Sequence, residues 1–118
     1  MQAIPVLHVT SADAAEEFYC EELGFELDFA ERPDPTLRDP CYMGVSRDGA
    51  LLHLSSHSGD GVSGGVVLFS CDDVEALHAE FVAKNVKIHV GPIKQTWGVR
   101  ELYVRDPDGN SLRFGVQG

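Results

Sequence analysis

The chain has 118 residues, 43% of them hydrophobic and 24% charged, which suits one globular domain and excludes a disordered protein. Its 19 acidic and 9 basic side chains give a formal net charge of -10, which disfavours nucleic acid as a partner and is compatible with a cationic ligand. No run approaches the ~20 apolar residues that a membrane-spanning helix needs, so no membrane partner is expected.

The first quarter of the chain predicts a strand followed by a helix. Residues 4–9 (IPVLHV) are mostly apolar and are typical of a strand. Ser11 is a suitable N-cap for a helix over residues 12–23, and Gly24 is a suitable stop at its C-terminus. This order predicts a β-strand that leads directly into one amphipathic helix.

The next segment predicts a strand, a loop and a hairpin. Apolar and polar residues alternate over residues 25–31, which predicts a half-buried strand. Three prolines make residues 32–40 a loop. Asp48-Gly49 is a hairpin turn signal between strands at 41–46 and 50–56.

The second half of the chain repeats the order of strand, helix, strand and hairpin. Residues 66–70 (VVLFS) predict a strand, and Asp72 or Asp73 predicts the cap of a helix that ends near Asn85. The remaining predicted elements are a strand at 86–90, a loop at 91–98, and a hairpin of strands 99–104 and 110–116 around Asp108-Gly109.

The repeat predicts the fold class. The two Asp-Gly turns lie 60 residues apart and the order of elements is the same, which indicates two tandem βαβββ modules, at about 1–58 and 64–118. We therefore expect an α+β fold in one domain, 1–118, whose modules form a curved mixed sheet. One helix covers only one face of each module, so the other faces are expected to form a ligand trough.

The two hairpins carry one polar residue each at the same place. His53 lies between Leu52 and Leu54, and Arg113 occupies the equivalent position in the second repeat. Because side chains alternate along a strand, both should face the trough while the leucines pack on the helices. Arg113 then either binds an anion in the trough or forms a salt bridge with an acid such as Glu101.

The cysteines indicate the redox compartment. Cys20, Cys41 and Cys71 are odd in number and form no CxxC pair, which argues against a disulfide framework. The N-terminal residues have no basic leader or long apolar core, so no export signal is expected. We expect a reduced, cytoplasmic protein with these cysteines as small buried residues, and a reactive thiol as the alternative.

Two motifs resemble a known superfamily. The segment FYCEELGF after the first helix and the ending RELYVRDPDGNSLRF, with the paired modules, resemble the vicinal oxygen chelate superfamily over essentially the whole chain. This superfamily contains glyoxalase I, extradiol dioxygenases, fosfomycin resistance enzymes and bleomycin resistance proteins.

The resemblance implies four positions for a divalent metal. They fall at about Ile4, His53, Val66 and Arg113, and only His53 has a donor atom suited to a metal. His8 is discounted because a change of register by one residue would turn it to the opposite face. We therefore expect no metal site and no cofactor, with His53 as a polar wall residue of the trough and metal ligation as its alternative.

Within the superfamily the chain looks most like the bleomycin resistance proteins. Pro5, the segment GFELDFAE and the loop QTWGVREL resemble their N-terminal strand, groove-lining segment and tryptophan loop. Those proteins are acidic dimers that bind the drug in grooves at the dimer interface without modifying it. Carried over, and joined by residues expected to face the trough, the predicted ligand-binding residues are Trp97, Phe29, Asp28, Glu31, His53, Glu101, Tyr103 and Arg113.

These observations predict a metal-free, homodimeric protein that binds a small molecule and has no catalytic residues. Trp97 is the only tryptophan and lies in a loop, where it can stack on a planar ligand or anchor the dimer interface. The specific prediction is sequestration of a bleomycin-type antibiotic or another drug-like ligand. The alternatives are a metal-dependent lyase or dioxygenase with an atypical site around His53, and a partner-binding module without a small ligand.

Overall fold

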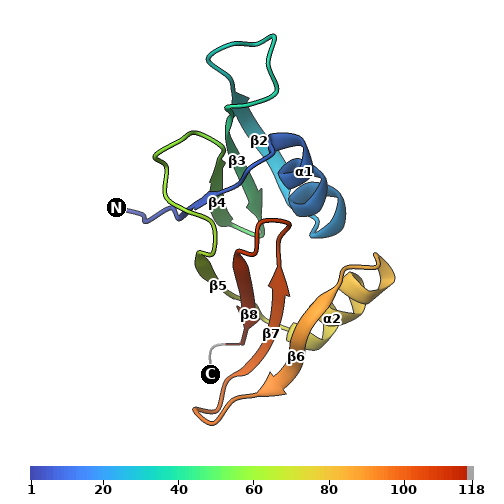
Figure 1. Cartoon of the computed structure of the whole chain (residues 1–118). Helices are drawn as coiled ribbons and strands as arrows, with labels where there is room; N and C mark the ends of the chain where they lie inside the picture. The colour runs from blue at the N-terminus through green and yellow to red at the C-terminus, as the bar shows by residue number, and fades with distance from the viewer. Residues whose placement is uncertain (117–118) are drawn as a thin grey trace. The chain divides into compact units, whose positions relative to one another are not determined.

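The computed structural model describes residues 1–116, and the chain divides into two compact units. Among the described residues, the first unit comprises 1–65 together with 106–110, and the second comprises 66–105 and 111–116. Each unit contains one four-stranded mixed sheet, so the predicted α+β fold with two βαβββ modules is confirmed. The two modules form separate sheets, which we call sheet 1 and sheet 2 (Figure 1).

Sheet 1 has the strand order β1-β4-β3-β2. β1 runs parallel to β4, and the other neighbouring pairs are antiparallel. The elements of this module are β1 (Val6–His8), α1 (Ala12–Glu16), η1 (Glu17–Glu22), β2 (Glu26–Glu31), β3 (Tyr42–Arg47) and β4 (Ala50–Ser55).

Sheet 2 repeats this topology with the order β5-β8-β7-β6. β5 is parallel to β8, and both β6 and β8 are antiparallel to β7. The elements of this module are β5 (Val66–Ser70), α2 (Val74–Ala83), β6 (Ile88–Lys94), β7 (Arg100–Arg105) and β8 (Ser111–Gly115).

The helix starts confirm the predicted caps. The Ser11 side chain accepts a hydrogen bond from the Ala14 amide, and Asp73 accepts one from the Ala76 amide. Each bond satisfies a backbone donor that has no partner within the first helical turn. Asp73, rather than Asp72, is therefore the cap of α2.

The first helix differs from its prediction. α1 is a single short α-helical stretch, and from Glu17 the chain continues as the π-helix η1. The amide of Leu23 accordingly donates to the Phe18 carbonyl, five residues back. The wider turn brings both Phe18 and Tyr19 into the core, where their rings meet edge to face with centroids 5.2 Å apart.

Two strands were also predicted incorrectly. β2 is exposed along its whole length rather than half-buried, because it is the edge strand of sheet 1 and a bulge between Leu27 and Phe29 breaks its alternation. β6 extends to Lys94, through part of the predicted loop, because irregular pairing accommodates Gly91 and Pro92 at the edge of sheet 2.

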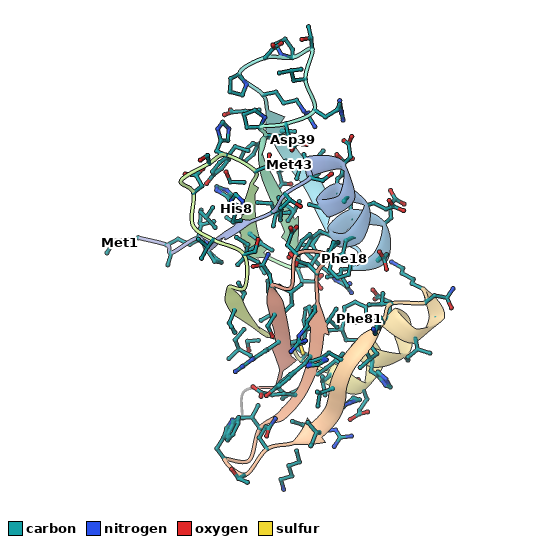
Figure 2. The ribbon with its side chains drawn as sticks, viewed as in Figure 1. Met1, His8, Phe18, Asp39, Met43 and Phe81 are labelled. Carbon is teal, nitrogen blue, oxygen red and sulfur yellow. The ribbon has the colours of Figure 1, made fainter. Side chains whose placement is uncertain are left out.

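The core of each unit lies on the helix side of its sheet. Met43, labelled in Figure 2, is fully buried there, and Phe81 of α2 packs edge to face on Phe114 of β8. The other fully buried aliphatic strand residues are Val45, Leu52, Leu54, Leu102, Val104 and Leu112. No helix among residues 1–116 is long and apolar enough to cross a membrane.

A buried polar network closes the first unit. Asp106, predicted as a turn former, accepts hydrogen bonds from the amides of Asp108 and Asn110 through one carboxylate oxygen. Its other oxygen accepts from the Tyr19 hydroxyl and the Asn110 side chain, both at 2.8 Å. The side chain of Asn110 in turn donates to the His8 carbonyl. This network fixes the turn 106–110 against the π-helix and β1.

Candidate ligand-binding site

Each sheet has one face covered by its helix and a second face that we call the outer face. Leu52 and Leu54 are fully buried on the helix side of β4, and His53 between them is half-buried on the outer face. Arg113 has the same relation to Leu112 and Phe114 in β8. The predicted orientation of the two polar residues within their own sheets is therefore confirmed.

A row of four residues crosses the outer face of sheet 1. Phe29, Gly44, His53 and Val6 stand in register on neighbouring strands. Gly44 has no side chain, and the Phe29 ring lies in the space that a β-carbon at this position would occupy. The ring therefore lies against the sheet surface, and Phe29 is 37% exposed.

Tyr42 completes an aromatic cluster with Phe29 and His53. Its ring is nearly parallel to that of Phe29, with centroids 6.2 Å apart, and nearly perpendicular to that of His53 at 5.2 Å. The Tyr42 hydroxyl and Nδ1 of His53 are 2.8 Å apart and share a hydrogen bond. Burial, with a smaller effect of the Asp60 carboxylate, raises the pKa of Tyr42. The hydroxyl therefore stays protonated at neutral pH and can serve as a hydrogen-bond donor.

Two predicted carboxylates flank this cluster. Glu31 stands in register with Tyr42, and the carboxylate of Asp28 accepts a 3.1 Å hydrogen bond from the Ser46 hydroxyl. Both acids are exposed on the edge strand β2. The outer face of sheet 1 thus combines flat aromatic surface with negative charge, an arrangement suited to a planar or cationic ligand.

The outer face of sheet 2 carries a second group of predicted residues. The Arg113 guanidinium carbon lies 5.0 Å from the centroid of the Tyr103 ring, its partner in register on β7. The Tyr103 hydroxyl donates to the Glu101 carboxylate at 2.7 Å and accepts from the Gln95 amide at 2.8 Å. The bond to Glu101 is the largest cause of a raised pKa at Tyr103. Glu101 is 4% exposed, so Tyr103 is the partner of a nearly buried carboxylate.

Trp97 lies in the turn between β6 and β7. Two backbone hydrogen bonds, from Gln95 to Val99 and from Gly98 to Gln95, close this turn. The tryptophan side chain is 63% exposed. Its indole face is therefore available in the single chain, both for a ligand and for a partner subunit.

The structure thus distributes the predicted site residues between two clusters. Phe29, Asp28, Glu31 and His53 lie on the outer face of sheet 1. The members belonging to sheet 2 and its β6–β7 turn are Glu101, Tyr103, Arg113 and Trp97.

The residues near His53 and Arg113 do not fit the metal that the superfamily implies. Gly44 and Val6 stand in register with His53, and Tyr103 and Leu68 stand in register with Arg113. Glycine and aliphatic side chains offer no ligand atom, and the Tyr103 oxygen is already bonded to Glu101. Across residues 1–116 no three His, Cys, Asp or Glu side chains are grouped so that they could hold a metal ion.

The predicted orientation of His8 is wrong. The register of β1 puts it two residues beyond Val6, so it shares the outer face with His53 instead of facing the opposite side. Its Nδ1 atom is buried and has no hydrogen-bond partner among the described residues (His8 is labelled in Figure 2). One further histidine still leaves the outer face short of the three donors of a usual metal site.

Sequence reasoning missed Tyr42, Gly44 and Gln95. The alternation of Tyr42, Gly44 and Ser46 with buried Met43 and Val45 was visible in CYMGVS and could have assigned the first two to the outer face. No local pattern could have indicated that Gln95 reaches the Tyr103 hydroxyl, because this contact depends on the irregular end of β6.

The cysteines are poor nucleophiles. Cys41 is buried, and Cys20 and Cys71 are half-buried rather than buried as predicted. Desolvation, with smaller effects of Glu16 and other acids, raises the pKa of Cys20 to about 11, and burial also raises the pKa of the other two thiols. All three are free thiols, and none is poised for thiolate chemistry at neutral pH.

Comparison with known proteins places this architecture in a family. The profile described as "Glyoxalase superfamily protein" matches residues 1–118, the entire sequence. The chain belongs to the glyoxalase superfamily. No functionally curated protein is similar enough to count as a match.

Solved structures of this superfamily include both binding proteins and enzymes. A bleomycin-binding protein complexed with bleomycin is 25% identical, with a TM-score of 0.80 over 100% of this chain and 99% of that chain. A glyoxalase/bleomycin resistance protein from Streptomyces sp. CB03234 is 29% identical, with a TM-score of 0.75 over 97% and 98% of the chains. A lactoylglutathione lyase from Agrobacterium tumefaciens is 22% identical, with a TM-score of 0.76 over 98% and 92%, and shows the fold alone.

Proposed function

We propose that this superfamily member is a metal-free binding protein of the bleomycin resistance type. It sequesters a planar drug or drug-like ligand and does not convert it. The proposed ligand-binding residues are Phe29, Asp28, Glu31 and His53 on sheet 1, and Trp97, Glu101, Tyr103 and Arg113 on sheet 2 and its β6–β7 turn. The protein acts as a homodimer, with the ligand in a groove between its two copies.

The aromatic cluster of sheet 1 carries this proposal. The Phe29 ring lies over Gly44 and contacts Tyr42 and His53, and the residue is 37% exposed. Covering this exposed aromatic surface with another molecule would be favourable, because it removes apolar area from water. Aromatic rings bind planar ligands by stacking, with an additional gain when the ligand is cationic.

The charges near the cluster favour a cationic ligand. Asp28 and Glu31 are exposed acids on β2 with no ion pair among the described residues. The arginines of the loop after β2 do not offset them, because Arg38 forms a two-pronged contact with Asp13 at 2.6 to 3.2 Å. Arg32 donates to the Arg38 carbonyl and lies 3.9 Å from the same aspartate.

Exposed apolar residues support the dimer. Val66, Leu68 and Ile93 lie on the outer face of sheet 2, and each is more than 40% exposed in the single chain. Such a face is stabilised when a partner subunit or a ligand covers it. The likeness to the bleomycin-binding protein further supports a ligand of that kind. The free thiols Cys20, Cys41 and Cys71 favour a reducing, cytoplasmic location.

Titration with bleomycin tests the proposal. The intrinsic fluorescence of Trp97 should be quenched at micromolar drug, and light scattering or ultracentrifugation should give a dimer. The recovered drug should be chemically unchanged. Absence of quenching together with absence of heat in a calorimetric titration would contradict the proposal.

The rival function is a metal-dependent lyase or dioxygenase built around His53. The donor set argues against it, since the neighbours of His53 in register are Gly44 and Val6. Elemental analysis after incubation with nickel, zinc, manganese or iron(II) separates the two functions. We expect less than one metal per chain, and the same result in wild type and His53→Ala; one full equivalent that His53→Ala removes would favour the enzyme.

A further inference from the structure

We propose that Arg113 is a carboxylate-binding residue, so that the ligand of this protein carries an acidic group as well as flat apolar surface. This inference rests on the proposed function, because it assigns the chemistry of one part of the same ligand. It was not implied by the family pattern, which would place a metal-binding carboxylate of the protein at this position.

The Arg113 charge is not neutralised within the described chain. Its Nε atom is buried and has no hydrogen-bond partner among residues 1–116, and these residues also provide no ion pair to the guanidinium. A buried donor left without a partner is costly, and the cost is larger for a charged group. The site is therefore complete only when an acceptor from outside the described chain reaches this arginine.

Glu101 does not serve as that acceptor. The predicted salt bridge is absent from the described structure, and the Glu101 carboxylate instead accepts a hydrogen bond from the Tyr103 hydroxyl at 2.7 Å. The other open position on that hydroxyl is taken by Gln95. Tyr103 is thus held by two hydrogen bonds, and the Glu101 carboxylate is already the partner of Tyr103.

The same arrangement orients Arg113 for an external ligand. Its guanidinium carbon stands over the Tyr103 ring at 5.0 Å, so the ring supports the cation through its π-face. The Tyr103 ring is itself held by Glu101 and Gln95. The planar N–H edges of a guanidinium match a carboxylate through two parallel hydrogen bonds.

The surroundings indicate an organic acid rather than a free inorganic anion. Leu68 stands in register with Arg113, and Val90 stands in register with Tyr103. Leu68 is half-exposed, as are Val66 and Ile93 on the same face. With a net charge of -10 the protein repels small anions at long range. Binding then requires both the arginine contact and apolar contacts, which an aromatic carboxylate provides together.

Matched probes test this inference. Calorimetric titrations compare 2-naphthoate with 2-naphthamide, which has the same shape without the charge, and with inorganic phosphate. Wild type should bind naphthoate about tenfold or more tightly than the amide, because a charge-assisted, bidentate contact is strong. Phosphate should bind far more weakly than naphthoate. Phosphate binding as tightly as naphthoate would overturn the assignment to an organic acid.

Substitutions assign the effect to Arg113. Arg113→Gln should remove the preference for naphthoate, and Arg113→Lys should keep only part of it, because lysine retains the charge but not the planar edge. Arg105→Gln is the matched control, since it removes the same charge from an exposed residue of β7 and should leave the preference intact. In an NMR spectrum of the wild type, the Arg113 Nε–H signal should move with naphthoate and not with naphthamide.

The possible failures are distinguishable. Equal binding of naphthoate and naphthamide, with no effect of Arg113→Gln, would overturn the carboxylate assignment and leave the proposed aromatic binding site intact. No binding of either probe and no shift of the Arg113 signal would also overturn it, while the bleomycin titration decides the proposed function separately. If the amide spectrum shows that Arg113→Gln is unfolded, the carboxylate assignment is tested by naphthoate binding to Arg113→Lys and by the Arg113 Nε–H signal of the wild type.

Discussion

The ring of Phe29 fills the space above Gly44 on the outer face of sheet 1, where a β-carbon would otherwise stand. The two residues are partners in register on β2 and β3. The absence of a side chain at position 44 therefore allows the Phe29 ring to lie over the strand beside Tyr42 and His53. The glycine thus shapes the surface on which we propose that the ligand binds.

Gly44→Ala should separate ligand binding from stability. The new methyl group must displace the Phe29 ring, but that ring lies on an exposed edge strand and can rotate outward. We expect the free energy of unfolding to change by no more than about 1 kcal/mol. Affinity for a planar drug should fall about tenfold, since the stacking surface is lost. Glu26→Ala, elsewhere on β2, is the control, and unchanged affinity in Gly44→Ala would refute the role of the Phe29 ring.

Asp106→Ala should strongly destabilise the protein. The substitution leaves the buried Tyr19 hydroxyl without an acceptor, and it removes one of the two acceptors of the Asn110 side-chain amide and the acceptor of two turn amides. We expect a loss of about 3 kcal/mol in the free energy of unfolding, measured by urea denaturation. Asp72→Ala, an exposed acid beside the cap of α2, should change it by less than about 0.5 kcal/mol. Similar values for both variants would contradict the importance of the buried network.

A double-mutant cycle should isolate the bond between Tyr19 and Asp106. Tyr19→Phe retains the ring contacts with Phe18 and Phe25 and removes only the hydroxyl. Because the two side chains share one 2.8 Å hydrogen bond, their effects on stability should not add, with a coupling of about 1 to 3 kcal/mol. Strict additivity would indicate that the hydroxyl and the carboxylate act independently.

Stability should decrease at alkaline pH. Burial, together with the Asp106 carboxylate, raises the pKa of Tyr19 in the folded protein, whereas tyrosine in the unfolded chain ionises near pH 10. Above about pH 10 the unfolded state releases this proton and the folded state keeps it, so the free energy of unfolding falls as pH rises. Below that pH the contribution is fully present.

The alkaline decrease should be smaller in Tyr19→Phe. It should not vanish, since Tyr42 and Tyr103 also have raised pKa values and contribute with the same sign. Urea denaturation between about pH 9 and 11 measures the slope for both proteins. A steeper alkaline slope in Tyr19→Phe than in wild type would disagree with the assignment.

The repeated pattern of the hairpins was sufficient to predict much of this fold. Leucines on both sides of His53 and the Asp-Gly turns at a spacing of 60 residues indicated two equivalent modules, and the strand registers agree. Ser11 and Asp73 marked helix starts because their side chains satisfy specific backbone donors. These features depend on residue types and their spacing, which can be read directly from the sequence.

The features that escaped prediction depend on interruptions of periodicity. The bulge at Asp28 shifts Phe29 to the outer face, and nothing in the alternation before it indicates that shift. Gly91 and Pro92 resembled a loop, but an edge strand tolerates both at an irregular pairing. The partner of Arg113 was also open, because the choice between Glu101 and a ligand depends on the hydroxyl of Tyr103.

Mapping a bound drug by NMR tests the central claim most directly. Bleomycin should be titrated into isotope-labelled protein, and the shifts of amide and side-chain signals should be followed residue by residue. We expect the largest shifts at Phe29, Tyr42 and His53 and at the indole of Trp97, with little change along α1 and α2. Saturable shifts confined to the exposed sides of the helices, or a spectrum unchanged at millimolar drug, would contradict it.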